Sequence, residues 1–120
     1  MKVVIAVLFY LLVVSVPSFA EDIDDYKITV VEEGRHGPIT FIVTIDPAGK
    51  IKNMRVVKNN ELRGRKINKK RFLRQFTGKG TNDPIRLRKD IDAVTSATIS
   101  SNAAARAARK ALEAWEIKFN

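Results

Sequence analysis

Hydrophobic and polar residues alternate along three segments in the first half of the chain, at residues 26–31, 39–45 and 51–57. A period of two, together with many Ile, Val and Thr residues, predicts β-strands. A loop rich in Gly and charged residues, 32–38, separates the first strand from the second. Only the turn at residues 46–50 separates the second strand from the third. Its proline and glycine suit a reverse turn, so these two strands should form an antiparallel hairpin.

The second half of the chain contains both kinds of pattern. Apolar and charged residues alternate again at 85–91, which predicts a fourth strand. Before it, Phe72 and Phe76 stand four residues apart, the spacing of one helix face. A short helix over residues 68–76 would bury both rings and expose the basic side chains around them.

The last element is predicted to be a long amphipathic helix. Residues 102–115 are rich in alanine, the best helix former, and the small side chains would let the helix lie close to a sheet. We therefore predict an α+β fold, with an antiparallel sheet of about four strands and both helices packed against it. The apolar side of the long helix carries Ala104, Ala107, Ala108, Ala111, Leu112 and Trp115.

A cluster of hydroxyl side chains, within residues 92–101, stands directly before this helix. Ser100 or Ser101 would be the N-cap, because a serine oxygen accepts hydrogen bonds from the first helical N–H groups. A helix N-terminus also attracts phosphate. Helix grammar alone favours ordinary capping as the explanation of serine and threonine at this place, with phosphate binding as the open alternative.

Residues 1–20 have the layout of a secretory signal peptide. Lys2 precedes an apolar run, and small residues stand before the expected cut after Ala20. The apolar run, residues 3–16, is shorter than the roughly 20 residues of a membrane-spanning helix, which favours cleavage over a retained anchor. We expect residues 21–120 to form a single extracytoplasmic domain without stable membrane insertion.

The chain is strongly basic, with 22 Lys and Arg against 13 Asp and Glu, and a net charge of +9. Without Lys2, 21 basic and 13 acidic residues leave the mature chain at +8. A basic surface could bind an anionic surface or an acidic partner. Export makes nucleic acid a poor candidate.

Few side chains are suited to catalysis. The chain has no cysteine and one histidine, His36, which we expect on the surface of a Gly-rich loop. The sequence shows no arrangement typical of a nucleophilic triad or a metal site, so redox chemistry would require an organic cofactor.

The segment Asp92-Ala93-Val94-Thr95-Ser96-Ala97-Thr98 resembles a known modification motif. It is similar to the flavinylation motif of the FMN-binding domain family, Asp-x-x-(Ser/Thr)-Gly-Ala-Thr. In that family the last threonine carries FMN through a phosphodiester bond. This chain has Ser96 where glycine is usual, and serine is less suited to a positive φ.

Three further segments resemble the family in the same order along the chain. Residues 34–39 resemble the glycine-containing entrance to its sheet, and residues 59–64 resemble a stretch whose Glu and Gly lie beside the flavin, here Glu61 and Gly64. Residues 71–79 are similar to a Phe-Leu-x-Gln-Phe-x-Gly-Lys segment of small members. The resemblance covers about residues 34–115, and several matches in order are more specific than one motif.

The resemblance implies an extracytoplasmic electron carrier rather than an enzyme with its own substrate. A separate, FAD-dependent flavin transferase would attach FMN to Thr98, and the partners would be membrane or periplasmic redox proteins. The alternatives are FMN bound without a covalent bond, and a cofactor-free exported basic binding domain. The predicted cofactor-binding residues are Thr98, Asp92, Thr95, Ser96, Ala97, Ser100, Glu61 and Gly64.

Overall fold

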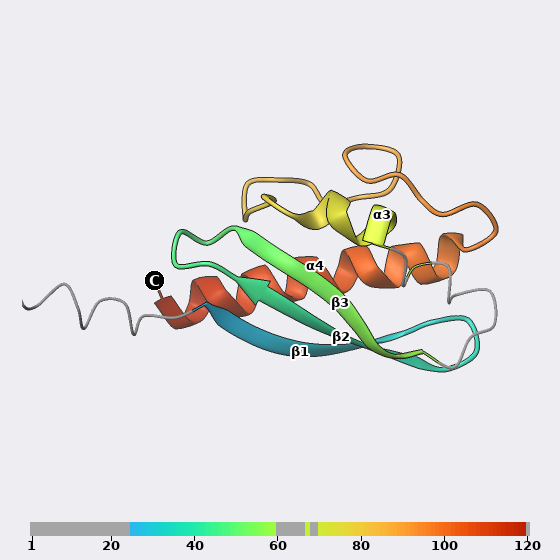
Figure 1. Cartoon of the computed structure of the whole chain (residues 1–120), viewed down its shortest axis with the longest axis horizontal. Helices are drawn as coiled ribbons and strands as arrows, with labels where there is room; N and C mark the ends of the chain where they lie inside the picture. The colour runs from blue at the N-terminus through green and yellow to red at the C-terminus, as the bar shows by residue number, and fades with distance from the viewer. Residues whose placement is uncertain (1–24, 60–66, 68–69, 120) are drawn as a thin grey trace, which may run out of the picture.

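A three-stranded antiparallel sheet and one long helix form the frame of the domain (Figure 1). The structure is a computed structural model, and it describes residues 25–59, 67 and 70–119. The predicted signal peptide, residues 1–20, and the two residues Glu61 and Gly64 therefore lie outside the described residues. The elements are β1 (Tyr26–Glu33), β2 (Pro38–Ile45), β3 (Ile51–Asn59), α3 (Lys70–Leu73), the 3₁₀ helix η2 (Arg74–Phe76) and α4 (Thr98–Phe119).

The sheet has the order β1-β2-β3, with both neighbouring pairs antiparallel, so the predicted hairpin is confirmed. Its turn is held by the Asp46 carboxylate, which accepts hydrogen bonds from the N–H groups of Ala48 and Lys50 at 2.9 and 3.0 Å. Gly49 has a φ of +84°, as the turn requires. The predicted loop at 32–38 is shorter than expected, because β1 continues to Glu33 and β2 begins at Pro38.

Helix α4 covers one face of the sheet by lying across β1 and β2 (Figure 1). The predicted alanine face is confirmed, since Ala104, Ala108 and Ala111 are completely buried. Small side chains let the helix backbone approach the sheet closely, where Phe41 and other β2 side chains fill the core. The α+β class predicted from the sequence is therefore confirmed.

The aromatic end of α4 packs against the hairpin turn. Trp115 is partly buried and packs against the core, as expected of an anchoring residue. A Cβ atom added to Gly49 would stand only 2.8 Å from the Trp115 ring, so the close approach of helix and turn requires glycine there.

The predicted middle helix is present as α3 followed by η2. Phe72 and Phe76 are both buried, as the spacing predicted, with their rings edge to face and their centroids 5.5 Å apart. Two backbone hydrogen bonds join the segment after η2 to Ile51 of β3, one from Gly78 N–H at 2.7 Å and one to Lys79 C=O at 2.8 Å. The helix is therefore attached to the edge of the sheet.

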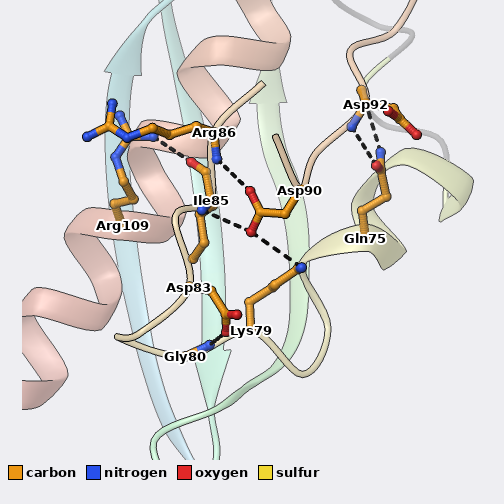
Figure 2. A network of polar contacts seen from close by, with 9 residues as sticks. All are labelled: Gln75, Lys79, Gly80, Asp83, Ile85, Arg86, Asp90, Asp92 and Arg109. Atoms are coloured by element: carbon orange, nitrogen blue, oxygen red, sulfur yellow. Dashed lines mark hydrogen bonds and ion pairs between the residues drawn. The ribbon is translucent and has the colours of Figure 1, made fainter. Parts of the chain in front are cut away.

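The predicted strand at residues 85–91 is wrong, and within the described residues the sheet has three strands rather than about four. The segment folds back on itself, with φ values of +49° at Ile85 and +68° at Arg88. The Asp90 carboxylate holds it closed by accepting hydrogen bonds from the N–H groups of Ile85 (3.1 Å) and Arg86 (3.0 Å) (Figure 2). The apolar alternation reflects burial of Ile85 and Ile91 inside a turn.

The Asp90 carboxylate also forms an ion pair with Lys79, at 3.3 Å. Burial raises the pKa of Asp90, but the two backbone N–H groups and the Lys79 ammonium outweigh it and leave the pKa below its ordinary value. Arg109 of α4 donates a hydrogen bond to the Ile85 carbonyl at 2.6 Å (Figure 2). The ion pair holds the irregular segment between η2 and α4 together, and the Arg109 hydrogen bond attaches it to α4.

One carboxylate, that of Glu32 in β1, is buried between the sheet and α4. Its side chain is 6% exposed, and it forms ion pairs with Arg106 at 2.9 Å and Lys110 at 2.7 Å. Burial raises the pKa of Glu32, but the hydrogen bonds and charges of these two cations outweigh it and lower the pKa below 4.5. No helix in the described part of the chain is both long and apolar enough to cross a membrane.

Candidate functional site

The candidate site centres on Thr98, which is the first residue of α4. Its side chain is exposed, so its hydroxyl is accessible from solvent. The N–H groups of the first turn of a helix lack intrahelical acceptors and carry the positive end of the helix dipole. The structure thus presents a free-standing hydroxyl at a position that favours a phosphate group.

The two neighbouring serines have a different role from the predicted one. Ser100 and Ser101 lie inside the first turn of α4 and are buried, so the prediction that one of them is the N-cap is wrong. The Ser101 hydroxyl donates to the Ala97 carbonyl at 2.7 Å and accepts from the Val94 N–H at 3.0 Å. The Ser101 hydroxyl therefore attaches the loop before α4 to the first turn of the helix. The helix begins at Thr98, four residues before the start predicted at residue 102.

Ser96 takes the backbone conformation for which glycine is suited, with a φ of +66°. The Ala97 N–H donates to the Val94 carbonyl at 2.9 Å, which closes a four-residue turn with Ser96 at its third position. A positive φ at that position is characteristic of a type II turn, where glycine is preferred. The motif glycine of the family is thus replaced by a residue in a strained conformation.

We expect Ser96→Gly to stabilise the domain by roughly 0.5–1 kcal/mol, because relief of the left-handed conformation exceeds the greater freedom of glycine in the unfolded chain. Urea unfolding of the mature protein would measure the change. The matched control is Thr95→Gly, at a position without a positive φ, which should lower stability. A loss of stability in Ser96→Gly would contradict the role given to this turn.

Gln75 of η2 joins the middle helix to the start of the loop directly before α4, residues 92–97, which we call the site loop (Figure 2). Its side-chain carbonyl accepts from the Asp92 N–H at 2.7 Å, and its amide donates to the Asp92 carbonyl at 3.0 Å. The amide also lies 3.3 Å from the Phe72 carbonyl. Sequence reasoning missed this contact, although a glutamine held between two buried phenylalanines was a usable signal.

A cavity of about 470 Å³ lies between the α3–η2 segment and the site loop. Phe72 and Val94 give it an apolar part, and Arg71 is the cation among its described lining residues. A volume in this range is typical of small-molecule and cofactor sites. We call this cavity the loop groove; it is lined by Arg71, Phe72, Gln75, Asp92, Ala93, Val94 and Thr95.

The predicted site residues separate into two groups. The first group is exposed and consists of Asp92, Thr95, Ser96 and Thr98. Two of its members, Asp92 and Thr95, also line the loop groove. Ala97 and Ser100 are buried under the loop, where they shape it and are not accessible.

Metal chemistry finds no support in the described residues, where no three His, Cys, Asp or Glu side chains lie close enough together to hold an ion. His36 is exposed in the β1–β2 loop, as expected.

The residues present fit an FMN group. An accessible hydroxyl for its phosphate end lies at a helix N-terminus, and next to it Thr95 borders a groove with apolar walls and one arginine. Flavins combine an anionic phosphate with a largely apolar ring system, so both parts of the site match in chemistry.

The comparisons with known proteins agree with this geometry. No curated protein has a matching sequence. The model of one family, described as the FMN-binding domain, matches residues 34–113, which are 80 of the 120 residues. This stretch includes the sheet from the β1–β2 loop onward, the α3–η2 segment, the site loop and most of α4. The chain therefore belongs to the FMN-binding domain family.

Proposed function

We propose that the mature protein carries FMN bound covalently to Thr98 and acts as an extracytoplasmic electron carrier. The observation that supports this most directly is the position of Thr98, exposed at the start of α4 while the adjacent serines are buried. Family membership supports FMN binding, and the accessible hydroxyl supports the covalent form of it.

In the proposed attachment, the Thr98 hydroxyl gives up its proton and forms a bond to the FMN phosphorus of FAD. The bond between the two phosphates of FAD breaks, and AMP leaves with the displaced oxygen. A separate flavin transferase would catalyse this step, because Asp92 is the one carboxylate, and no histidine stands, among the described residues that line the loop groove. The Asp92 carboxylate would help to position the acceptor hydroxyl.

The resulting phosphodiester carries one negative charge, which the start of α4 can offset. The dipole of a helix this long favours an anion at its first turn. Arg71 on the opposite wall of the loop groove adds a full positive charge. Phe72 and Val94 provide an apolar contact surface for the ring system.

When bound, FMN supplies the reversible uptake of electrons that the side chains of this protein lack. The chain has no cysteine, so thiol–disulfide exchange is not available to it. A covalent bond keeps the cofactor in place outside the cytoplasm, where flavin that dissociates is not replaced. We therefore propose membrane or periplasmic redox proteins as donor and acceptor, and residues 1–20 as the cleaved leader.

The test is the intact mass of the mature protein after export from a host that contains an active flavin transferase. We expect a gain equal to one FMN less one water, located by peptide mapping on the peptide with Thr98. An unmodified mass, with the transferase shown to act on a second substrate, would contradict covalent attachment. A flavin titration of that unmodified protein would then separate reversible FMN binding from a cofactor-free domain.

A further inference from the structure

A second groove lies on the other side of the α3–η2 segment, between it and β3. Its volume is about 450 Å³. Met54 and Leu73 are buried in its apolar part, to which the partly buried Val56 contributes. We call it the basic groove, because four of its remaining described lining residues are Lys or Arg. These remaining residues are Lys52, Asn53, Arg55, Lys70, Arg74 and Thr77.

All the charged side chains among the described lining residues of the basic groove are positive. Four cations line it, and no carboxylate is among its described lining residues. Lys52 forms an ion pair with Asp25, at 2.8 Å. Arg55, Lys70 and Arg74 are exposed and have no ion-pair partner in the part of the chain that the structure describes.

This arrangement does not stabilise the domain by itself. Cations gathered around one hollow repel each other, and such a group raises the local concentration of anionic ligands instead. The chain does pair its cations elsewhere, since Arg106 and Lys110 both bind Glu32. The three unpaired cations with an apolar floor are therefore features of a recognition surface, which combines a polar rim with a less polar centre.

The basic groove and the loop groove are the two sides of one short segment. Lys70, Leu73 and Arg74 face the former, while Arg71, Phe72 and Gln75 face the latter. Figure 1 shows α3 beside β3, where this segment borders the sheet. An α-helix with its side chains is only about 10 Å wide. A protein bound in the basic groove would thus lie about one helix width from the loop groove, which Thr95 lines three residues before Thr98.

We infer that the basic groove is the docking surface for an acidic segment of a redox partner protein. The inference rests on the proposed function in one respect, namely that the partner exchanges electrons with a flavin on Thr98. The three unpaired cations fit carboxylates, and the floor of Met54, Val56 and Leu73 fits apolar side chains between them. A protruding polypeptide can enter a hollow and reach that floor, whereas the flat headgroup layer of a membrane contacts only the rim.

The test compares two double variants that lower the net charge equally. Arg55→Glu/Arg74→Glu changes the basic groove, and Arg35→Glu/Lys89→Glu changes exposed cations that line neither groove. The probe is a fluorescein-labelled Glu-Glu-Leu repeat peptide, measured by anisotropy at low salt. We expect about tenfold weaker binding for the groove variant and about twofold or less for the control variant. A Lys-Lys-Leu repeat peptide should not bind.

Several outcomes would overturn the inference. These are equal losses in both variants, no binding of the acidic peptide, or equal binding of the basic peptide. Vesicles of equal phosphatidylglycerol and phosphatidylcholine that bind the wild type but not the groove variant, while peptide binding is unchanged, would assign the surface to membranes.

The result is independent of flavin attachment when the mature wild type and Thr98→Ala are measured side by side. Equal peptide binding by both proteins, with no flavin on either, would contradict the proposed function and support the docking surface. Flavin on the wild type without peptide binding would support the proposed function and contradict the docking surface.

Discussion

Thr98→Ala is expected to contain no covalent flavin after export from a host with the transferase, while its fold is unchanged. The substitution removes the one oxygen to which the phosphodiester would be joined. Thr98 is exposed and alanine favours helices, so the free energy of unfolding should change by no more than about 0.5 kcal/mol. Intact mass measures the modification, and circular dichroism with urea unfolding measures the fold.

The matched control for this experiment is Thr95→Ala. Thr95 is also exposed and lies three residues earlier, in the loop before α4, where it borders the loop groove. Thr95→Ala should keep covalent flavin on the Thr98 peptide. Covalent flavin in Thr98→Ala would mean that another hydroxyl is the acceptor, and its disappearance from Thr95→Ala would identify Thr95 as that residue.

Glu32→Gln is expected to lower the free energy of unfolding by about 2 kcal/mol near neutral pH. Glutamine keeps the size of the side chain but removes the charge that Arg106 and Lys110 share. Breaking a fully buried pair costs more, but the two cations are 36% and 59% exposed and keep part of their hydration. The matched control is Glu33→Gln, one residue on, which is exposed and has no described ion pair. It should change stability by less than about 0.5 kcal/mol.

The same pair of proteins gives a test in acid. Because the folded-state pKa of Glu32 lies below 4.5, the folded state favours the carboxylate. The contribution of this carboxylate to the free energy of unfolding is complete above the unfolded-state pKa. It is lost as the pH falls through the folded pKa, when the wild-type side chain becomes neutral. The difference between wild type and Glu32→Gln should therefore shrink below pH 4.5. A constant difference in acid, or an equal loss in Glu33→Gln, would contradict the role of this ion pair.

Much of the fold could be predicted because local chemistry determines it. The hairpin turn was predicted from its proline and its glycine, and Gly49 has the positive φ that the turn requires. The alanine face of α4 follows from helix periodicity, and it is buried as predicted. The hydroxyl cluster was predicted to stand directly before this helix, at residue 102, whereas α4 begins four residues earlier and has Thr98 as its first residue.

What could not be predicted depends on particular side-chain contacts that propensity and residue spacing do not specify. The alternation at residues 85–91 is compatible with a strand, and only the Asp90 carboxylate, folded back on Ile85, shows that it is a closed turn. Ser101 has a side chain suited to a cap, but its hydroxyl accepts a hydrogen bond from the Val94 N–H and donates one to the Ala97 carbonyl. Propensity and periodicity describe single residues and their spacing, so they cannot distinguish these uses.

Two polar residues of structural importance were visible in the sequence but were not recognised. Glu32 follows the alternation of β1 onto the inward side of the sheet, where a charged residue requires partners. Gln75 stands beside the buried Phe76, and its bonds to Asp92 hold the site loop against the middle helix. The available signal was a polar residue on the inward side of a strand for Glu32, and a polar residue next to a predicted core phenylalanine for Gln75.

The length of α4 separates the two ends of the domain. With 22 residues it spans about 30 Å, with Thr98 at one end and Phe119 at the other. Phe119 contacts Tyr26, with ring centroids 5.6 Å apart, so β1 begins beside the end of α4. Figure 1 shows the end of α4 and the start of β1 together at one end of the domain, opposite the loop before α4. An affinity tag, a fluorescent label or a surface tether joined at either end of the described domain would therefore leave the approach to Thr98 open, which makes immobilised electrochemistry practicable for this protein.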